Sequence, residues 1–444
     1  MADQTVYVQT MGCDKNTVDS ENMVGGLLQQ GYTLTDEPSE ASLIIVNTCC
    51  FIEAAKKQSI EVIFDLLPYR TQPEENCQTF VVAGCMAQRY AEELKAELPE
   101  VDYFIGVNQI DDLPDIIQNQ ADAKIYTSAE IRTESEKRYV RKGQITEYLK
   151  ISEGCDNHCT YCAIPNIRGR HRSRSPEVII KEAQTLYDSG VRELILVAQN
   201  LTQYGSDLDG DMDLADLLDE LAGRIPFTWI RLLYMYPEGI DAKLLDVINA
   251  HDNICHYFDM PIQHTEDEVL HRMGRRIDKK EIYGKVNLIR EKCPDAVLRT
   301  TVIAGFPGES EAQFNAMLET LNDLKFERLG AFAYSQEEGT PVAEMPDQID
   351  DAVKEERVRQ IYERQEAIST NWNTRWIDQE MTVLIDEIDE NGIAIGRTRG
   401  DAPEIDGDVI IETSQPEPGH FYRVKIVDAI GFDLIGEVIN ESTK

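Results

Sequence analysis

Three cysteines, Cys155, Cys159 and Cys162, have the spacing C-x3-C-x2-C, which constrains the fold and chemistry of this chain more than any other feature. They directly follow a predicted strand at 148–152, so they lie in a loop at the carboxyl end of that strand, where βα folds place their chemistry. Three thiolates on a tight loop can bind three irons of a cubane cluster and leave the fourth open. Zinc is the alternative, but zinc sites usually combine C-x2-C pairs with a fourth ligand. The spacing favours an iron–sulfur cluster whose open iron can chelate the amino and carboxylate groups of S-adenosylmethionine.

A second set of three cysteines is dispersed, and each member stands just past a predicted strand: Cys13 after 5–10, Cys49 after 43–48 and Cys85 after 79–84. In an open α/β sheet the carboxyl ends of parallel strands meet at one edge, so cysteines distant in sequence can converge there. Free cysteines are also often buried in cores, which is the alternative for each one taken alone. Their shared position on three successive strands favours a second cluster with one free iron.

The other four cysteines have no such placement, and we predict that they are core or incidental residues: Cys50, Cys77, Cys255 and Cys293. The role of Cys50 is open, because it adjoins a predicted ligand. The sequence MADQTVYVQT has neither a basic nor an apolar region of the signal-peptide kind, and no stretch approaches 18 apolar residues. We therefore expect a cytoplasmic protein without a membrane span, in which disulfides are rare.

The chain is acidic, with 43 Lys and Arg against 81 Asp and Glu and a net charge of −38. A field of that sign repels phosphate backbones and attracts basic partners. A general bias of a proteome toward acidic surfaces would produce the same charge, so charge alone does not identify a partner.

The pattern of elements predicts an α/β protein in three parts. Residues 5–110 alternate strands and helices, which indicates an open, mostly parallel sheet covered on both faces. Six further strand–helix units start at 148–152 and indicate a partial (β/α)6 barrel. Short strands without helices follow from residue 378 and predict a small antiparallel barrel of about 65 residues. The predicted boundaries are an N-terminal cluster domain at 1–115, a linker at 116–140, the partial barrel at 141–375 and the small barrel at 376–444.

Loops after two of the barrel strands are candidates for binding the nucleoside of S-adenosylmethionine. Gly305 and Gly308 would let the backbone approach a flat ligand, and Glu309 starts the next predicted helix. Gln199 and Thr202 follow the second strand of the barrel and could bind the same cofactor. Ordinary loop chemistry is the alternative for all five residues.

The most basic stretch of the chain, at 164–174, follows the C-x3-C-x2-C loop and holds four alternating arginines in its last seven residues. It could bind a carboxylate or phosphate, or its arginines could pair with neighbouring acids as a structural brace. His158, inside the cysteine loop, is expected to face solvent.

At this point the residues resemble a known family, the methylthiotransferases, which are radical S-adenosylmethionine enzymes with an N-terminal cluster domain, a radical barrel and an OB-like C-terminal TRAM domain. Within it the chain is most similar to the RimO branch, which acts on a ribosomal protein. The phrases that carry the resemblance are GCDKNTVDSENM (12–23), VNTCCFI (46–52), AGCMAQRY (83–90), SEGCDNHCTYCAIPNIRGRHRSR (152–174), LILVAQNLTQYG (194–205), RLLYMYP (231–237), PIQH (261–264), LRTTVIAGFPGE (298–309), SQEEGTPVA (335–343) and GDAPEIDG (400–407). Two positions depart from the branch, because Cys50 replaces a usual glycine and Asn200 a common aspartate.

The resemblance implies two 4Fe–4S clusters and S-adenosylmethionine as cofactors. Cys155, Cys159 and Cys162 would hold the radical cluster, and Cys13, Cys49 and Cys85 the auxiliary cluster that supplies sulfur. No side chain is then expected to act as a catalytic acid or base, because the chemistry is cluster-based. The implied reaction adds a methylthio group to the β-carbon of an aspartate in ribosomal protein uS12. The implied partners are this substrate and an external electron donor, and we expect a monomer.

Two other functions are open at this stage. The transfer-RNA branch of the family, typified by MiaB, shares both cysteine sets, and a cluster protein without radical chemistry belongs to another class. A barrel that grips RNA should be basic, whereas residues 371–444 carry 16 acids and 6 bases. We therefore expect the acidic C-terminal loop to hold the basic ribosomal substrate through its four acids, Asp401, Glu404, Asp406 and Asp408. A solvated acidic turn is the alternative for this loop.

Overall fold

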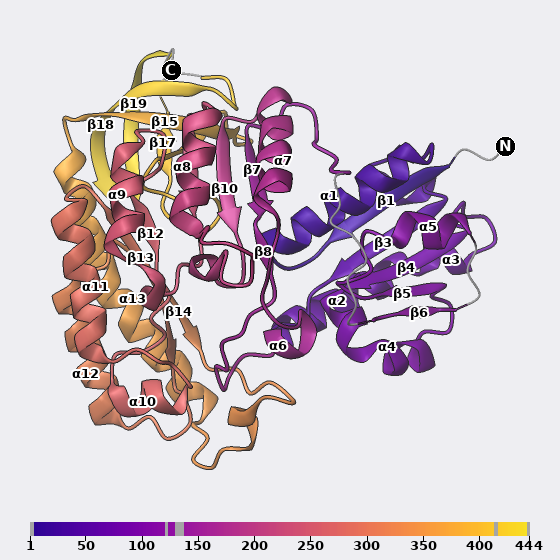
Figure 1. The fold of residues 1–444 in the computed structure, drawn as a ribbon, viewed down its shortest axis with the longest axis horizontal. Helices are drawn as coiled ribbons and strands as arrows, with labels where there is room; N and C mark the ends of the chain where they lie inside the picture. Colours follow the sequence, from indigo (N-terminus) through magenta and orange to yellow (C-terminus); the bar gives the residue numbers. More distant parts are fainter. Residues whose placement is uncertain (1–3, 120–122, 129–136, 413–415, 442–444) are drawn as a thin grey trace.

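The computed structural model describes residues 4–119, 123–128, 137–412 and 416–441. Three parts follow one another along the chain, and they are an α/β domain, a partial barrel of parallel strands and a small closed β-barrel (Figure 1). The fold is therefore α/β in the arrangement that the sequence predicts. Part of the predicted linker at 116–140 lies outside the described residues. No helix in the described ranges is long and apolar enough to cross a membrane.

The N-terminal domain contains a six-stranded parallel sheet with the order β2-β1-β3-β4-β5-β6. Its strands are β1 (Thr5–Thr10), β2 (Thr33–Leu34), β3 (Leu43–Thr48), β4 (Thr79–Gly84), β5 (Tyr103–Ile105) and β6 (Ile125–Tyr126). Its helices are α1 (Asp14–Gln29), α2 (Glu53–Leu66), α3 (Pro68–Thr71), α4 (Cys85–Glu97) and α5 (Leu113–Gln118). Alternate residues of a strand point to opposite faces. Ile44 and Phe80 therefore enter one core with α2 and α4, and Ile45 and Val81 enter another with α1 and α5.

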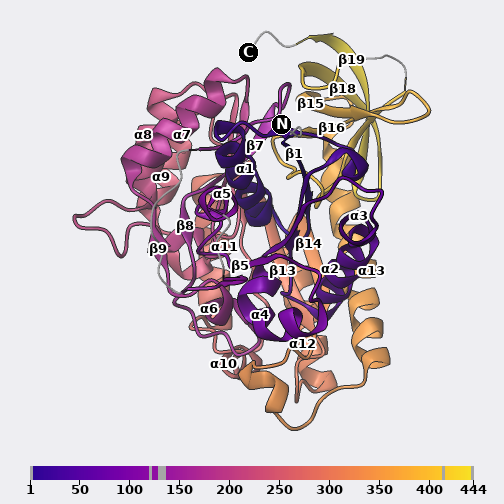
Figure 2. The same cartoon turned by 90° about the vertical axis from the view of Figure 1, so that its right-hand side faces the viewer.

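The central part consists of two three-stranded parallel sheets, β11-β10-β7 and β12-β13-β14. Its strands are β7 (Thr146–Lys150), β10 (Glu193–Val197), β11 (Trp229–Leu232), β12 (Tyr257–Asp259), β13 (Val297–Ala304) and β14 (Arg328–Ala333). A parallel bridge from Ile230 to Ile254 connects the two sheets, so β7 and β14 are the outer strands of one curved array. The strands run from the C-terminal barrel toward the loops beside the N-terminal domain, as Figures 1 and 2 show from two sides.

Helices cover the outer surface of this array: α7 (Pro176–Asp188), α8 (Leu214–Arg224), α9 (Ala242–Ala250), α11 (Lys279–Lys292), α12 (Glu311–Leu324) and α13 (Asp351–Asn373). The shorter elements are α6 (Ile164–Ile167), α10 (Asp267–Arg272), β8 (Ser152–Glu153) and β9 (Arg172–Ser173). Capping boxes at Asp213, Asp278 and Ser310 start α8, α11 and α12, because each cap satisfies backbone N–H groups that the first turn leaves free. One large apolar core joins these helices to the strands.

The C-terminal part is a closed five-stranded barrel with the order β15-β16-β17-β19-β18. Its strands are β15 (Glu380–Ile388), β16 (Ala394–Thr398), β17 (Val409–Ile411), β18 (Phe421–Ile430) and β19 (Asp433–Glu441). Most pairs are antiparallel, as predicted, but β17 and β19 are parallel. This pair is parallel because β18 crosses the barrel to pair with β15, and the hairpin from β18 then returns β19 alongside β17.

Buried ion pairs fix the C-terminal barrel to the amino ends of the central strands. Glu193 of β10 lies 2.9 Å from Arg231 of β11 and 2.8 Å from Arg397 of β16. Burial alone would raise the pKa of Glu193, but Arg397 and Arg231 outweigh it and lower this pKa to about 2. The carboxylate is therefore charged and shared between two domains, at the end of the strands opposite to the Cys155–Cys162 loop.

The acidic loop predicted to dock substrate contributes to the same interface. Asp401 is 2% exposed and lies 2.6 Å from Arg328 of β14. Asp406 lies 3.3 Å from Arg299 of β13 and accepts a 2.5 Å hydrogen bond from Tyr257. The docking prediction is therefore wrong for these two acids, because arginines distant in sequence already neutralise them. Glu404 is exposed and Asp408 is partly buried.

Asp401→Asn is expected to destabilise the protein by about 3–5 kcal/mol, because it leaves the buried guanidinium of Arg328 without its counter-charge. Urea denaturation of the metal-free protein, followed by tryptophan fluorescence, measures this change. Glu404→Gln in the same loop is the matched control and should change the stability by less than about 0.5 kcal/mol. Equal stabilities for the two variants would contradict the role given to the Asp401–Arg328 pair.

Candidate functional site

The loop with Cys155, Cys159 and Cys162 lies at the carboxyl end of the central strands, after β7 and β8. The backbone N–H of Cys155 donates to the Gly169 carbonyl at 3.2 Å, and the Thr160 N–H donates to the Met273 carbonyl at 2.9 Å. These bonds hold the loop against two later segments of the chain. Burial raises the pKa of Cys155, and it raises that of Cys162 to about 12. The thiols lie close enough to influence one another electrostatically, so this structure gathers all three.

The dispersed cysteines meet at the carboxyl edge of the N-terminal sheet. Cys13 directly precedes α1, Cys49 follows β3, and Cys85 is the first residue of α4. A Cβ atom at Gly12 would lie 2.9 Å from the Cys49 sulfur, so glycine at this position, with φ of +96°, permits the close approach of the two loops. Burial raises the pKa of Cys49, and it raises that of Cys85 to about 12. Cys85 also interacts electrostatically with Cys13 and Cys49.

Each set supplies three thiols, which fits a cubane cluster better than a single metal ion. In the described part of the chain no three Cys, His, Asp or Glu side chains could hold one metal ion. A cubane cluster needs a wider spacing, because each thiolate binds a different iron. The raised pKa values mean that the thiols must lose protons when they bind a metal, as thiolates are the ligands.

A small apolar cluster joins the N-terminal domain to the segment that follows Cys162. Cys85 and Cys50 pack there with Ala163 and Ile167, which follow the radical-site loop. Cys50 is fully buried, and the three remaining cysteines lie in the cores of the domains. The structure thus joins the edge of the N-terminal sheet to the cysteine loop of the central part (Figure 2).

Two side chains beside Cys159 have no counterpart in the sequence predictions. The Tyr236 hydroxyl lies 3.8 Å from the Cys159 sulfur, and the Arg275 guanidinium stacks 4.2 Å from the centre of the Tyr236 ring. Arg275 is 6% exposed, and within the described residues its Nε and Nη1 have no hydrogen-bond partner. A buried cation with free donors is suited to an anionic group of a ligand. The sequence Gly274-Arg275-Arg276 shows two adjacent cations, but only the fold brings Arg275 beside the cysteines.

The predicted cofactor residues lie at the same carboxyl edge of the barrel. Gln199 donates from Nε2 to Glu153 at 2.6 Å, and Thr202 donates to Asn200 at 2.9 Å. Gly305 and Gly308 form the turn after β13 with φ values of +76° and +74°. The Glu309 carboxylate is buried and accepts from the backbone N–H groups of Gly305 and Phe306. In this conformation Glu309 shapes the turn. Gly305 is buried, and a Cβ atom there would lie 2.3 Å from Cγ of Lys354, whereas Gly308 is exposed.

The basic stretch divides into buried and exposed arginines. Arg168 is 1% exposed, and Arg174 pairs with Glu182 of α7 at 2.6 Å. Both arginines pair with acidic side chains, as the alternative of a structural brace predicts. The Arg170 side chain is 89% exposed and lies 3.4 Å from Asp156. His158 is exposed, in agreement with its predicted position.

Comparisons with known proteins agree with this division of the chain. Family models match at residues 5–106 (Uncharacterized protein family UPF0004), 149–321 (Radical SAM superfamily) and 377–439 (TRAM domain). The chain is 45% identical over 441 residues to "Ribosomal protein uS12 methylthiotransferase RimO" of Clostridioides difficile (strain 630), covering 98% of this chain and 99% of that protein. It is 42% identical over 440 residues to the protein of the same name from Desulfitobacterium hafniense (strain Y51), with 98% of each covered.

Solved structures share the fold at low sequence identity. The radical S-adenosylmethionine methyltransferase TsrM from Kitasatospora setae, with cobalamin and a [4Fe-4S] cluster bound, matches with a TM-score of 0.56 at 14% identity. That match covers 76% of this chain and 77% of the other. The cobalamin-dependent radical enzyme OxsB matches with a TM-score of 0.51 at 11% identity over 82% and 56% of the two chains.

Proposed function

Because this chain belongs to the RimO family of ribosomal protein uS12 methylthiotransferases, we propose that it adds a methylthio group to the β-carbon of an aspartate in uS12. The observation that carries the proposal is the pair of three-thiol sites, one on the N-terminal sheet and one on the radical barrel, with Cys85 packed against Ala163 and Ile167, which follow the radical-site loop. The transfer-RNA alternative has no comparable support, since relatives of 42–45% identity over the full length carry the uS12 name.

The proposed assignment gives each set of thiols one cluster. Cys155, Cys159 and Cys162 would hold the radical 4Fe–4S cluster, and the three strand-end cysteines the auxiliary 4Fe–4S cluster. When bound, the radical cluster supplies an electron to S-adenosylmethionine, and the auxiliary cluster supplies the site of sulfur transfer. The protein would position both clusters through these thiols, of which Cys49, Cys85, Cys155 and Cys159 are buried, whereas Cys13 is exposed. No side chain is needed as a catalytic acid or base.

S-adenosylmethionine is assigned to the carboxyl edge of the barrel. Gln199, Thr202, Gly305 and Gly308 border the position of its nucleoside, and Glu309 holds the glycine turn in shape. Nε and Nη1 of Arg275 have no hydrogen-bond partner in the described part of the chain, and we assign them to the cofactor carboxylate.

Arg275→Gln is expected to weaken the binding of S-adenosylmethionine by roughly 10- to 100-fold, since a hydrogen bond to a charged group contributes about 1.5–3 kcal/mol. Isothermal titration calorimetry of the cluster-loaded protein measures this affinity. Arg276→Gln is the matched control, because Arg276 is adjacent in sequence but exposed. Unchanged affinity in Arg275→Gln, with full iron content, would remove Arg275 from the cofactor site.

The remaining assignments concern the surroundings of the enzyme. We propose a cytoplasmic monomer that receives electrons from an external donor and acts on uS12, free or within the ribosomal subunit.

The proposed domain boundaries are 1–115 for the auxiliary site, 116–140 for the linker, 141–375 for the radical barrel and 376–444 for the TRAM barrel.

Mass spectrometry of uS12 from cells with and without the gene tests the function. The expected result is a gain of one methylthio group on a single aspartate, present only with the gene. An unmodified uS12 in both strains, together with a modified transfer RNA, would replace the proposal with the transfer-RNA function.

A further inference from the structure

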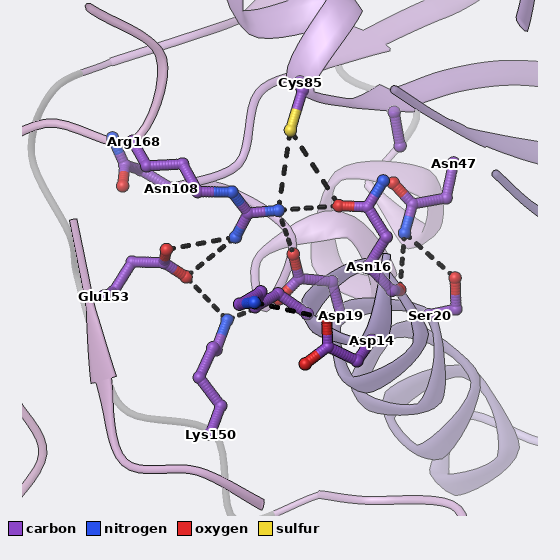
Figure 3. Close-up of polar contacts among 12 residues, drawn as sticks. Asp14, Asn16, Asp19, Ser20, Asn47, Cys85, Asn108, Lys150, Glu153 and Arg168 are labelled. Carbon is purple, nitrogen blue, oxygen red and sulfur yellow. Dashed lines mark hydrogen bonds and ion pairs between the residues drawn. The ribbon is translucent and has the colours of Figure 1, made fainter. Parts of the chain in front are cut away.

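A buried arginine, Arg168, links Cys85 of the strand-end set to Glu153, which lies two residues before Cys155 (Figure 3). It lies six residues after Cys162 on the central part of the chain, and its guanidinium reaches the N-terminal domain. Nη2 lies 3.5 Å from the Cys85 sulfur and donates to Asn16 at 2.7 Å. Nη1 donates to Glu153 at 2.9 Å. One planar cation therefore contacts a proposed auxiliary-cluster ligand and a carboxylate that directly precedes the radical-site loop.

The charges around Arg168 balance as a set of four. Arg168 lies 3.1 Å from Asp19 of α1 and 2.9 Å from Glu153 of β8. Lys150 bridges the same two carboxylates at 2.5 and 2.7 Å. Two cations and two anions are therefore ordered between the domains, and removal of either kind leaves one unbalanced charge near Cys85.

A second layer of hydrogen bonds fixes the position of the guanidinium. Asn16 accepts from Arg168 while its amide donates to the carbonyls of Met11 and Thr48, at 2.7 and 3.1 Å. These carbonyls belong to the loops that carry Cys13 and Cys49. Asn47 in turn donates to the Asn16 carbonyl at 2.8 Å. Arg168 is thus held in register with the loops of all three strand-end cysteines.

We infer that Arg168 is a positioning residue that sets the electrostatic environment of the auxiliary cluster, through a hydrogen bond to the Cys85 sulfur and the balanced charges around it. This inference rests on the proposed function, which assigns that cluster to Cys85. Hydrogen bonds to the ligand sulfurs and nearby net charge control the reduction potential of an iron–sulfur cluster. A buried cation favours the reduced form, because reduction adds a negative charge in a region of low dielectric constant.

The experiment uses the full-length chain with Cys155, Cys159 and Cys162 replaced by alanine, so that the auxiliary cluster is the one observed. Its midpoint potential is measured by an EPR-monitored redox titration. Arg168→Gln should decrease the equilibrium constant for one-electron reduction at least about tenfold, which corresponds to a decrease of about 59 mV in potential. Glu153→Gln, which removes a negative charge, should raise the potential. Arg170→Gln is the matched control in the same segment, and its exposed side chain should leave the potential unchanged.

The opposite shifts in midpoint potential expected for Arg168→Gln and Glu153→Gln separate an electrostatic role of Arg168 from a purely structural one. A brace without an electrostatic role would let both variants lower the melting temperature while the potential stays at the parent value, and that result would overturn the inference. If the Arg168→Gln variant binds no iron, the Glu153→Gln variant alone tests the inference. A midpoint potential of Glu153→Gln that does not rise above the parent value then overturns it. Absence of iron from the parent with intact Cys13, Cys49 and Cys85 would instead contradict the auxiliary site in the proposed function.

Discussion

Replacement of Cys155, Cys159 and Cys162 by alanine is expected to abolish the reductive cleavage of S-adenosylmethionine. These thiols are the donors of one loop, and hydrogen bonds from that loop to Gly169 and Met273 already hold it in place. Without the thiols no iron remains to anchor the amino and carboxylate groups of the cofactor. Release of 5′-deoxyadenosine under dithionite, measured by liquid chromatography, should fall to the level of the reductant alone.

The iron content provides the control for this variant. The parent should bind about eight irons and the triple variant about four, because the auxiliary site is separate. Retention of about four irons together with loss of cleavage assigns the radical chemistry to this loop. Cleavage at a rate comparable with that of the parent would show that the radical cluster lies elsewhere.

Replacement of Cys13, Cys49 and Cys85 by alanine is expected to have the complementary effect. Cleavage of S-adenosylmethionine should continue, because the radical-site loop belongs to the central barrel and keeps its three thiols. Formation of methylthiolated uS12 peptide should fall to background, because the sulfur donor site is lost. The two products, 5′-deoxyadenosine and methylthiolated peptide, are measured by mass spectrometry in the same reaction.

Cys77→Ala is the matched control for the second variant, since Cys77 is buried in the same domain but precedes β4, at the opposite end of this strand from Cys85. It should retain both activities, with at most a loss of stability. Methylthiolation at the parent level by the Cys13, Cys49 and Cys85 variant would exclude these residues from sulfur transfer and leave the radical assignment intact.

The sequence was sufficient to predict that the strand-end cysteines would meet. Apolar runs such as LIIVNT fix where a buried parallel strand ends, and parallel strands place all their carboxyl ends at one edge. Cys13, Cys49 and Cys85 therefore follow from local patterns and one rule of topology. The same reasoning placed the Cys155 loop at the carboxyl end of the first barrel strand.

The buried charges could not be predicted in this way. Asp401 looked like part of a solvated acidic turn because its partner, Arg328, is 73 residues away on another domain. Arg168 allowed two interpretations, and the choice depended on Asp19 and Asn16, which are about 150 residues earlier. Periodicity reports which face of an element is apolar, but it carries no information on which distant charge will neutralise a buried one.

The interface between the central strands and the C-terminal barrel limits how this enzyme can be recombined. Arg299 and Arg328 of the central part have Asp406 and Asp401 of the C-terminal barrel as counter-charges, and Glu193 has Arg397. A chimera that exchanges the barrel alone leaves these groups unmatched unless the donor carries the same charges. The charged residues of the TRAM barrel and those of the central strands therefore have to be exchanged together. A functional chimera must include the charged residues near the amino ends of the strands that the barrel contacts.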